Sequence, residues 1–184
     1  MRKLITLTVC CLLFTTLALK TTAQALKSED IKAQMLKDWE RAKAYTIDYL
    51  NTMPADKYSF KAVDSIRSFA QQMLHLASGN IFLMSNATDQ KPLPFVQSDL
   101  EKSSTAQQKD SVMYYVVTSY NYCIDAIKTF DTNKWGEKKN LFNKYEETRW
   151  ALMMKTFEHQ THHRGQATIY IRLQGIRPPQ ERLF

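Results

Sequence analysis

The sequence predicts an all-α protein, a bundle of four long antiparallel helices with one long crossover connection. Residues that break helices are scarce, since the 184 residues include only 4 glycines and 5 prolines, and they separate stretches long enough for helices. Each stretch carries apolar residues at steps of three and four, the spacing of an amphipathic helix. The length suits one domain with a sizeable core, and we expect that domain at residues 26–184.

Residues 1–25 have the layout of a secretory signal peptide. Two basic residues precede an apolar run at residues 4–19, and small residues follow up to Ala25, which is the order of an export signal. The apolar run is shorter than the roughly 20 residues of a membrane span. We therefore expect cleavage after Ala23 or Ala25, export to the periplasm or the extracellular space, and no stable membrane span in the mature chain. An uncleaved N-terminal anchor is the alternative.

Removal of the leader changes the composition of the chain. The formal net charge of +7 falls to +4, because Arg2, Lys3 and Lys20 lie in the leader. The remaining sequence has no basic stripe with interleaved aromatic residues, so nucleic acid is not expected as a partner. Cys123 becomes the single cysteine, which excludes an internal disulfide, and we expect it to be a small buried apolar residue.

The first helix is expected at residues 28–51 and the second from Asp64 or Ser65 to residue 85. Ser28 is a suitable N-cap, and the acidic residues that follow it suit the helix dipole. Pro54 ends the first helix, because proline does not continue a helix. Asp64 and Ser65 are both suitable N-caps for the second helix.

The third and fourth helices are expected at residues 108–130 and 145–174. Residues 86–107, before the third helix, are polar and contain two prolines. They indicate a long surface connection of the kind that a bundle with a crossover requires. The fourth helix ends at Gly175, which suits a left-handed C-cap, and Pro178 prevents its continuation.

Three of the four histidines stand close together near the end of the chain. His159 and His163 are four residues apart and share one face of a helix, where two imidazoles can bind one divalent ion. His162 lies off that face, so we expect it to be solvated or to lie behind the ligands. The pair needs a third ligand, and His75 is the only other histidine. Gln160 replaces the glutamate of the zinc-protease motif, so the general base of those enzymes is missing.

These residues carry a resemblance to a known family. The stretch at residues 159–178 resembles the C-terminal helix of DinB-like (YfiT-like) proteins, which are four-helix-bundle metalloproteins, and residues 64–77 resemble their second helix. The likeness covers most of the chain after the leader. It implies that His75, His159 and His163 bind one divalent metal ion. Zinc is the default ion and nickel the alternative, since imidazole accepts both.

Three imidazole ligands leave open positions on the ion, as in catalytic zinc sites. The ion could activate water or hold a thiolate. DinB-like relatives include thiol-dependent transferases and metal-dependent hydrolases, so the resemblance implies one of these activities on a small molecule, for example a thiol. A non-catalytic metal- or ligand-binding bundle is the competing interpretation. By the habit of the family we also expect a homodimer.

The sequence offers one residue to support the ligands and no clear general base. Gln166 lies one turn beyond His163, so we expect it to contact the ligands from behind. Glu158 precedes His159 directly and therefore points about 100° away around the helix. It is a poor candidate for the base.

Overall fold

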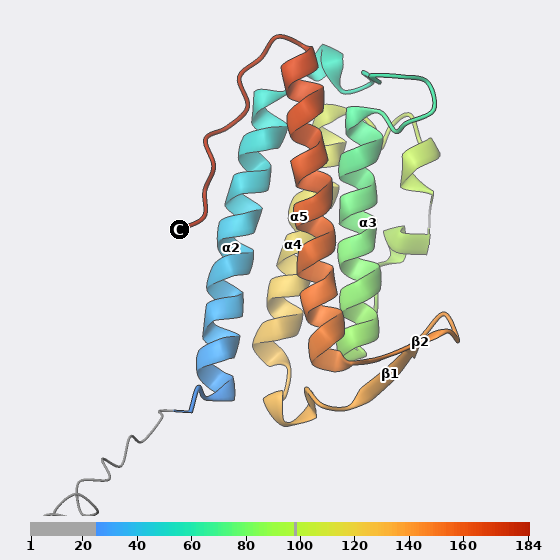
Figure 1. The fold of residues 1–184 in the computed structure, drawn as a ribbon. Coiled ribbons are helices and arrows are strands. Elements are labelled where there is room, and N and C mark those ends of the chain that lie inside the picture. Colours follow the sequence, from blue (N-terminus) through green and yellow to red (C-terminus); the bar gives the residue numbers. More distant parts are fainter. Residues whose placement is uncertain (1–24, 98) are drawn as a thin grey trace, which may run out of the picture.

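The structure, a computed structural model, describes residues 25–97 and 99–184. Four long helices form a bundle (Figure 1), and their bounds are α2 Ser28–Thr52, α3 Phe69–Thr88, α4 Lys109–Thr129 and α5 Arg149–Leu173. The one sheet among the described residues is a hairpin of two short strands, β1 Lys138–Leu141 and β2 Tyr145–Thr148. The predicted all-α bundle is confirmed. The predicted signal peptide lies, except for Ala25, outside the described residues.

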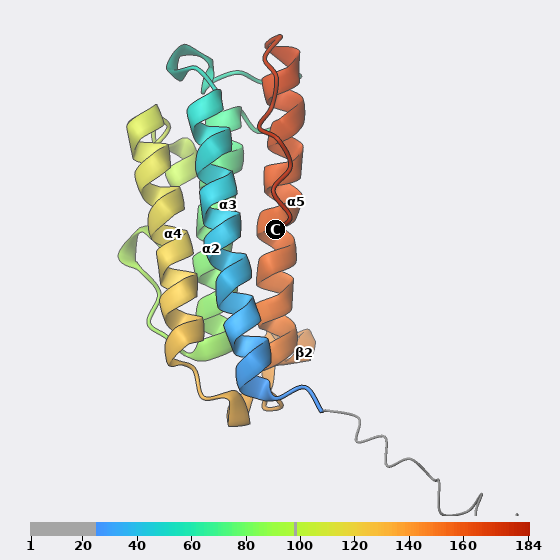
Figure 2. The same ribbon diagram turned by 90° about the vertical axis from the view of Figure 1, so that its left-hand side faces the viewer.

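The helices run up, down, down and up in chain order (Figures 1 and 2). α2 and α4 are antiparallel, since Lys32 bonds the carbonyl of Phe130 while Lys109 bonds that of Met53. α3 and α5 are also antiparallel, since Arg149 at the start of α5 bonds the carbonyl of Ala87 near the end of α3, and Tyr170 near the end of α5 bonds that of Arg67, just before α3. Figures 1 and 2 show that α3 and α4 run parallel, so the connection between them follows the length of the bundle. The predicted crossover is present, but the expectation that all four helices alternate in direction is wrong for α3 and α4.

The core lies between the four helices, with α3 packed against both α4 and α5. Trp39 of α2 is 1% exposed and makes edge-on ring contacts with Tyr120 of α4 and Phe157 of α5. Burying such a side chain contributes about 1.5–3 kcal/mol. Cys123 is fully buried, as expected, and burial raises the pKa of its thiol. Among the described helices, none is both long and apolar enough to cross a bilayer.

α3 begins at Phe69, later than predicted. Its N-cap is Ser68, whose hydroxyl accepts a hydrogen bond from the backbone N–H of Gln71, while the Gln71 side chain accepts from the backbone N–H of Ser68. This capping box satisfies two N–H groups that a helix start leaves unpaired. Neither Asp64 nor Ser65, the predicted caps, has a glutamine or glutamate three residues later, so the helix starts where the box forms.

α5 also begins later than predicted, at Arg149. Residues 145–148, expected as its first turn, pair as an antiparallel strand with residues 138–141. Thr148 then caps the helix by accepting a hydrogen bond from the backbone N–H of Ala151. The strands are short and largely exposed. Because they bury little, their residues are mostly polar and lack the alternation of apolar and polar residues that indicates a strand.

The start of α2 and the end of α5 differ little from the prediction. Lys27 occupies the cap position of α2 and Ser28, the predicted cap, is its first helical residue. Gly175 follows α5 with φ of +71°, the left-handed conformation predicted for it. The backbone N–H of Ile176 bonds the carbonyl of Ile171, which closes the end of the helix.

Candidate metal centre

His75 of α3 meets His159 and His163 of α5 where these two helices pack together. One ligand nitrogen from each ring lies within 4.8 Å of the others. The ring centroids are 4.4 Å apart for the two histidines of α5, and His75 lies 4.6 Å from His163 and 5.4 Å from His159. The structure thus brings together the three residues that the sequence singled out, with a donor set that suits a divalent ion. That they bind a metal stays a prediction.

The ring of His159 lies directly over Gly79 of α3. A Cβ atom added to Gly79 would stand 2.1 Å from Cε1 of His159, so the imidazole occupies the space that any other residue would fill. Nδ1 of His159 is buried and has no hydrogen-bond partner among the described residues. Such an atom costs about 1–3 kcal/mol when nothing compensates it. A metal ion bound at Nδ1 would supply the missing partner, and three neutral imidazoles are a donor set that fits a divalent ion.

Burial and mutual repulsion keep two of the rings neutral. The pKa of His163 is lowered to about 3, first by burial and then by the nearby His159 and His75. The pKa of His159 is lowered to about 4, again by burial first and then by His75 and His162. Imidazole binds metal only in its neutral form. Both rings are therefore already in the binding form at pH 7.

Glu101, in the crossover connection, holds His75. Its Oε1 lies 2.9 Å from Nδ1 of His75, and its Oε2 accepts a hydrogen bond of 2.6 Å from Arg67. A carboxylate acceptor fixes the proton on Nδ1 and leaves Nε2 of His75 with a free lone pair. Partners of this kind orient metal-binding histidines in many proteins.

Two glutamines lie beside His163, Gln72 on α3 and Gln166 on α5. The amide nitrogen of Gln72 lies 2.7 Å from Nδ1 of His163, and the same amide bonds the side chain of Gln166. Gln166 also lies 3.1 Å from Nε2 of His162. Gln166 therefore bonds Gln72 and His162, and its predicted role behind the ligands stays a prediction. His162 is exposed and off the face that carries the other two rings, as its spacing indicates.

The family model for DinB proteins matches residues 21–182. The chain belongs to the DinB family. Its fold is similar to that of a DinB-like protein from Bacillus cereus, with a TM-score of 0.68 and 16% identity over 80% of this chain and 95% of that one. A DinB-like protein from Bacillus subtilis has a TM-score of 0.61 and 18% sequence identity, and the match covers 82% of this chain and 96% of that one. A conserved protein from Enterococcus faecalis has a TM-score of 0.62 and 17% sequence identity, and the match covers 81% of this chain and 98% of that one. At these identities the likeness shows the fold alone. No curated protein matches the sequence.

Two cavities of this DinB protein flank the histidines. One, of about 390 Å³, is mostly apolar, and its lining comprises His75, Ser78, Gly79, Phe82, Leu83, Val96, Phe142 and His159. The other, of about 750 Å³, is polar and includes Lys61, Asp64, Arg67, Gln72, Glu101, His163 and Gln166 in its lining. The three histidines stand between these spaces, so a bound ion would be open to small molecules on more than one side.

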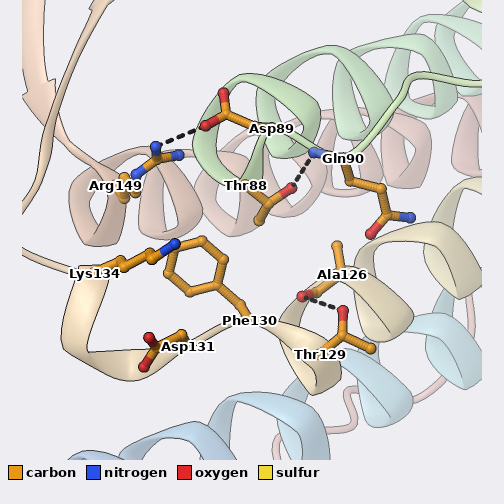
Figure 3. Close-up of a pocket in the computed structure, with 9 residues that line it drawn as sticks. All are labelled: Thr88, Asp89, Gln90, Ala126, Thr129, Phe130, Asp131, Lys134 and Arg149. Carbon is orange, nitrogen blue, oxygen red and sulfur yellow. Dashed lines mark hydrogen bonds and ion pairs between the residues drawn. The ribbon is translucent and has the colours of Figure 1, made fainter.

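A further cavity, of about 470 Å³, lies where α3 and α4 end and α5 begins (Figure 3). Its buried cation is already neutralised, since Arg149 bonds Asp89, Glu137 and the carbonyl of Ala87. Lys139 and Arg149 in turn hold the pKa of Asp89 below its usual range. These bonds tie α3 to the start of α5. The charge of Arg149 is satisfied by Asp89 and Glu137, and this cavity contains none of the four histidines, so it is not the candidate site.

Sequence reasoning missed Glu101 and Gln72. Gln72 stands three residues before His75, and that spacing puts the two on one helix face, so a signal for it existed. Glu101 reaches His75 from a connection without helical periodicity. Its contact depends on how that connection lies against α3, which no local pattern indicates.

Proposed function

We propose that this chain is an exported, metal-dependent enzyme of the DinB family that acts on a small molecule. Its working centre would be one divalent ion held by His75, His159 and His163. The observation that carries this proposal is the convergence of three imidazole nitrogens within 4.8 Å between two cavities. A closed structural site would supply a fourth protein ligand instead.

The residues around the ion have distinct tasks in this proposal. Glu101 fixes the proton and the orientation of His75, Gln72 contacts Nδ1 of His163, and Gly79 leaves room for the ring of His159. Zinc, or alternatively nickel, would lower the pKa of water or of a thiol at its open positions and so supply a nucleophile at neutral pH.

Of the two candidate reactions, thiol-dependent transfer and hydrolysis, the site favours the transfer. Hydrolases of the zinc-protease type use a free carboxylate as the base. Here both oxygens of Glu101, the carboxylate that bonds His75, are engaged, by His75 and Arg67. Gln160, which stands where those proteases have glutamate, is buried and bonded to Tyr120. A thiol can lose its proton to solvent on binding the ion and needs no such base. Hydrolysis is the second candidate, because three neutral imidazoles are also a donor set with which zinc activates water.

An assay of the zinc-loaded and nickel-loaded protein tests this proposal. One arm offers a small thiol with an electrophile that carries a leaving group, and the other offers activated esters without thiol. We expect thiol consumption that depends on the metal and is absent in His159→Ala. Ester hydrolysis alone would support the second chemistry. No turnover in either arm, with one ion bound per chain, would favour the non-catalytic metal- or ligand-binding bundle.

Export and assembly are separate proposals. The order of charged, apolar and small residues at 1–25 supports removal of a signal peptide, so mass spectrometry of the natively produced protein should find a chain that begins near Gln24 or Leu26. A full-length chain in the soluble fraction would contradict export. We also propose a homodimer, which sedimentation velocity would reveal as a species of twice the mass.

A further inference from the structure

The tip of the hairpin holds an aromatic residue in an unfavourable backbone conformation. Phe142 has φ of 59° and Asn143 has φ of 54°, and the backbone N–H of Lys144 bonds the carbonyl of Leu141 across them. Asparagine and glycine suit the left-handed region, whereas a bulky aromatic residue there is an outlier. Local turn chemistry therefore does not explain Phe142.

Packing explains Phe142 only in part. Its ring stacks on Phe82 of α3, with centroids 5.5 Å apart and planes 19° from parallel. However, Phe142 remains 67% exposed, so its burial adds little to stability. Strained residues of this kind gather at binding sites, where the surroundings hold them in place. The position of the ring therefore points to a ligand.

The stacked rings of Phe142 and Phe82 form part of the wall of the 390 Å³ cavity, and His75 and His159 form another part. This volume lies within the range of about 300–1,000 Å³ for small-molecule sites. None of the residues that line it carries a formal charge if its histidines are neutral, whereas the polar cavity on the other side includes Lys61 and Arg67. Of the two cavities, this one favours an uncharged, apolar group.

We propose that Phe142 and Phe82 bind an aryl or alkyl group of the substrate, whose polar end reaches the ion beside it. Phe142 is then a specificity-determining residue, placed over the cavity by the hairpin that the sequence did not reveal. This inference rests on the proposed metal centre, because the ion anchors the polar end. Beyond the proposed function, it states that the substrate carries an apolar group next to the end that reaches the ion.

Two hydroxamic acids test the inference through binding rather than activity. Acetohydroxamate and benzohydroxamate have the same metal-binding group and differ in the apolar part. Their dissociation constants for the zinc-loaded protein are measured by calorimetry, and the ratio of the two is compared among variants. Phe142→Asn keeps a residue suited to the turn and removes the ring. Tyr145→Thr is the control, because Tyr145 is an exposed aromatic residue of the same hairpin that does not line the cavity.

We expect the parent to prefer benzohydroxamate, and Phe142→Asn to reduce that preference by about three- to tenfold, the size of one aromatic contact. Acetohydroxamate should bind both proteins equally, and Tyr145→Thr should keep the parent's ratio. Ser78→Leu, which fills the cavity from α3 without touching the hairpin, should reduce the preference too.

The outcomes separate this inference from the proposed function. A ratio unchanged by both Phe142→Asn and Ser78→Leu, in protein that binds zinc and acetohydroxamate, overturns the apolar site and leaves the metal centre intact. A parent that binds no zinc overturns the metal centre, and this inference with it.

Discussion

Replacing Gly79 with alanine should remove the metal without touching a ligand. The new Cβ would lie 2.1 Å from Cε1 of His159, about 1.3 Å short of the 3.4 Å at which ordinary contact begins. The imidazole is the mobile end of a side chain and moves away, whereas the backbone of α3 does not. A metal–nitrogen bond tolerates only about 0.2 Å of such displacement. His159 therefore ceases to be a ligand.

The expected loss of zinc affinity in Gly79→Ala follows from the loss of His159 as a ligand. Even residues that only orient ligands change affinity by about 10- to 100-fold, so we expect a loss of at least about 100-fold in zinc affinity. Zinc at 100 times the parent's dissociation constant stabilises the parent by about 2.7 kcal/mol and Gly79→Ala by only about 0.4 kcal/mol. For a chain of this length, the zinc-dependent shift in Tm falls from about 5–11 °C to about 1 °C.

Thermal melts with zinc and with EDTA measure this difference, and Gly165→Ala is the matched control. Gly165 lies on α5, and a Cβ added there meets nothing within 4 Å. In EDTA Gly165→Ala should melt a few degrees above the parent, since alanine favours a helix over glycine by about 1 kcal/mol. In Gly79→Ala the same gain offsets the cost of displacing the ring of His159. Only Gly79→Ala should lose the zinc shift. Retention of the full shift by Gly79→Ala would show that the ring of His159, as it lies over Gly79, is not a ligand.

Three further predictions concern the groups around the site and in the core. Glu101→Gln should weaken zinc binding about 10- to 100-fold in chelator competition, because a neutral amide holds the Nδ1 proton of His75 less firmly, while Glu146→Gln, at an exposed ion pair, should not. The metal-free parent should lose stability from about pH 6.5 towards pH 3, because unfolded His163 binds a proton that the folded ring, with a pKa of about 3, does not. Chemical denaturation should show a shallower dependence for His163→Ala. Cys123, fully buried and with a raised thiol pKa, should react with a thiol reagent only after unfolding in urea.

Each of these predictions has a result that contradicts it. Equal zinc affinity of Glu101→Gln and the parent would mean that the carboxylate does not support a ligand. Parallel pH profiles of the parent and His163→Ala would place that ring in solvent. Rapid labelling of Cys123 in native protein would show that α4 does not bury it as described.

The helices and the pairing of His159 with His163 could be predicted because both follow from periodicity, whereas His75 was added to the pair by the resemblance to the family. His159 and His163 share a face through their spacing alone, and the same spacing excludes His162. Ser68 and Gln71 also have the spacing of a capping box, which predicts the start of α3 at the residue where the structure has it.

The remaining features depend on contacts between distant segments. The strands at residues 138–141 and 145–148 are largely exposed and stand out by neither composition nor alternation. Their turn lacks the glycine that usually marks a hairpin. The role proposed for Phe142 and the contact of Glu101 with His75 both require the three-dimensional path of a connection. Local propensity gives no access to that path.

The metal content of four single variants tests the central claim most directly. His75→Ala, His159→Ala, His163→Ala and His162→Ala, together with the parent, are loaded with zinc or with nickel, freed of excess metal and measured by mass spectrometry for metal per chain. We expect about one ion per chain in the parent and in His162→Ala, and almost none in the other three. A parent that retains neither zinc nor nickel, or a His162→Ala variant that loses the ion while His159→Ala keeps it, would contradict the account.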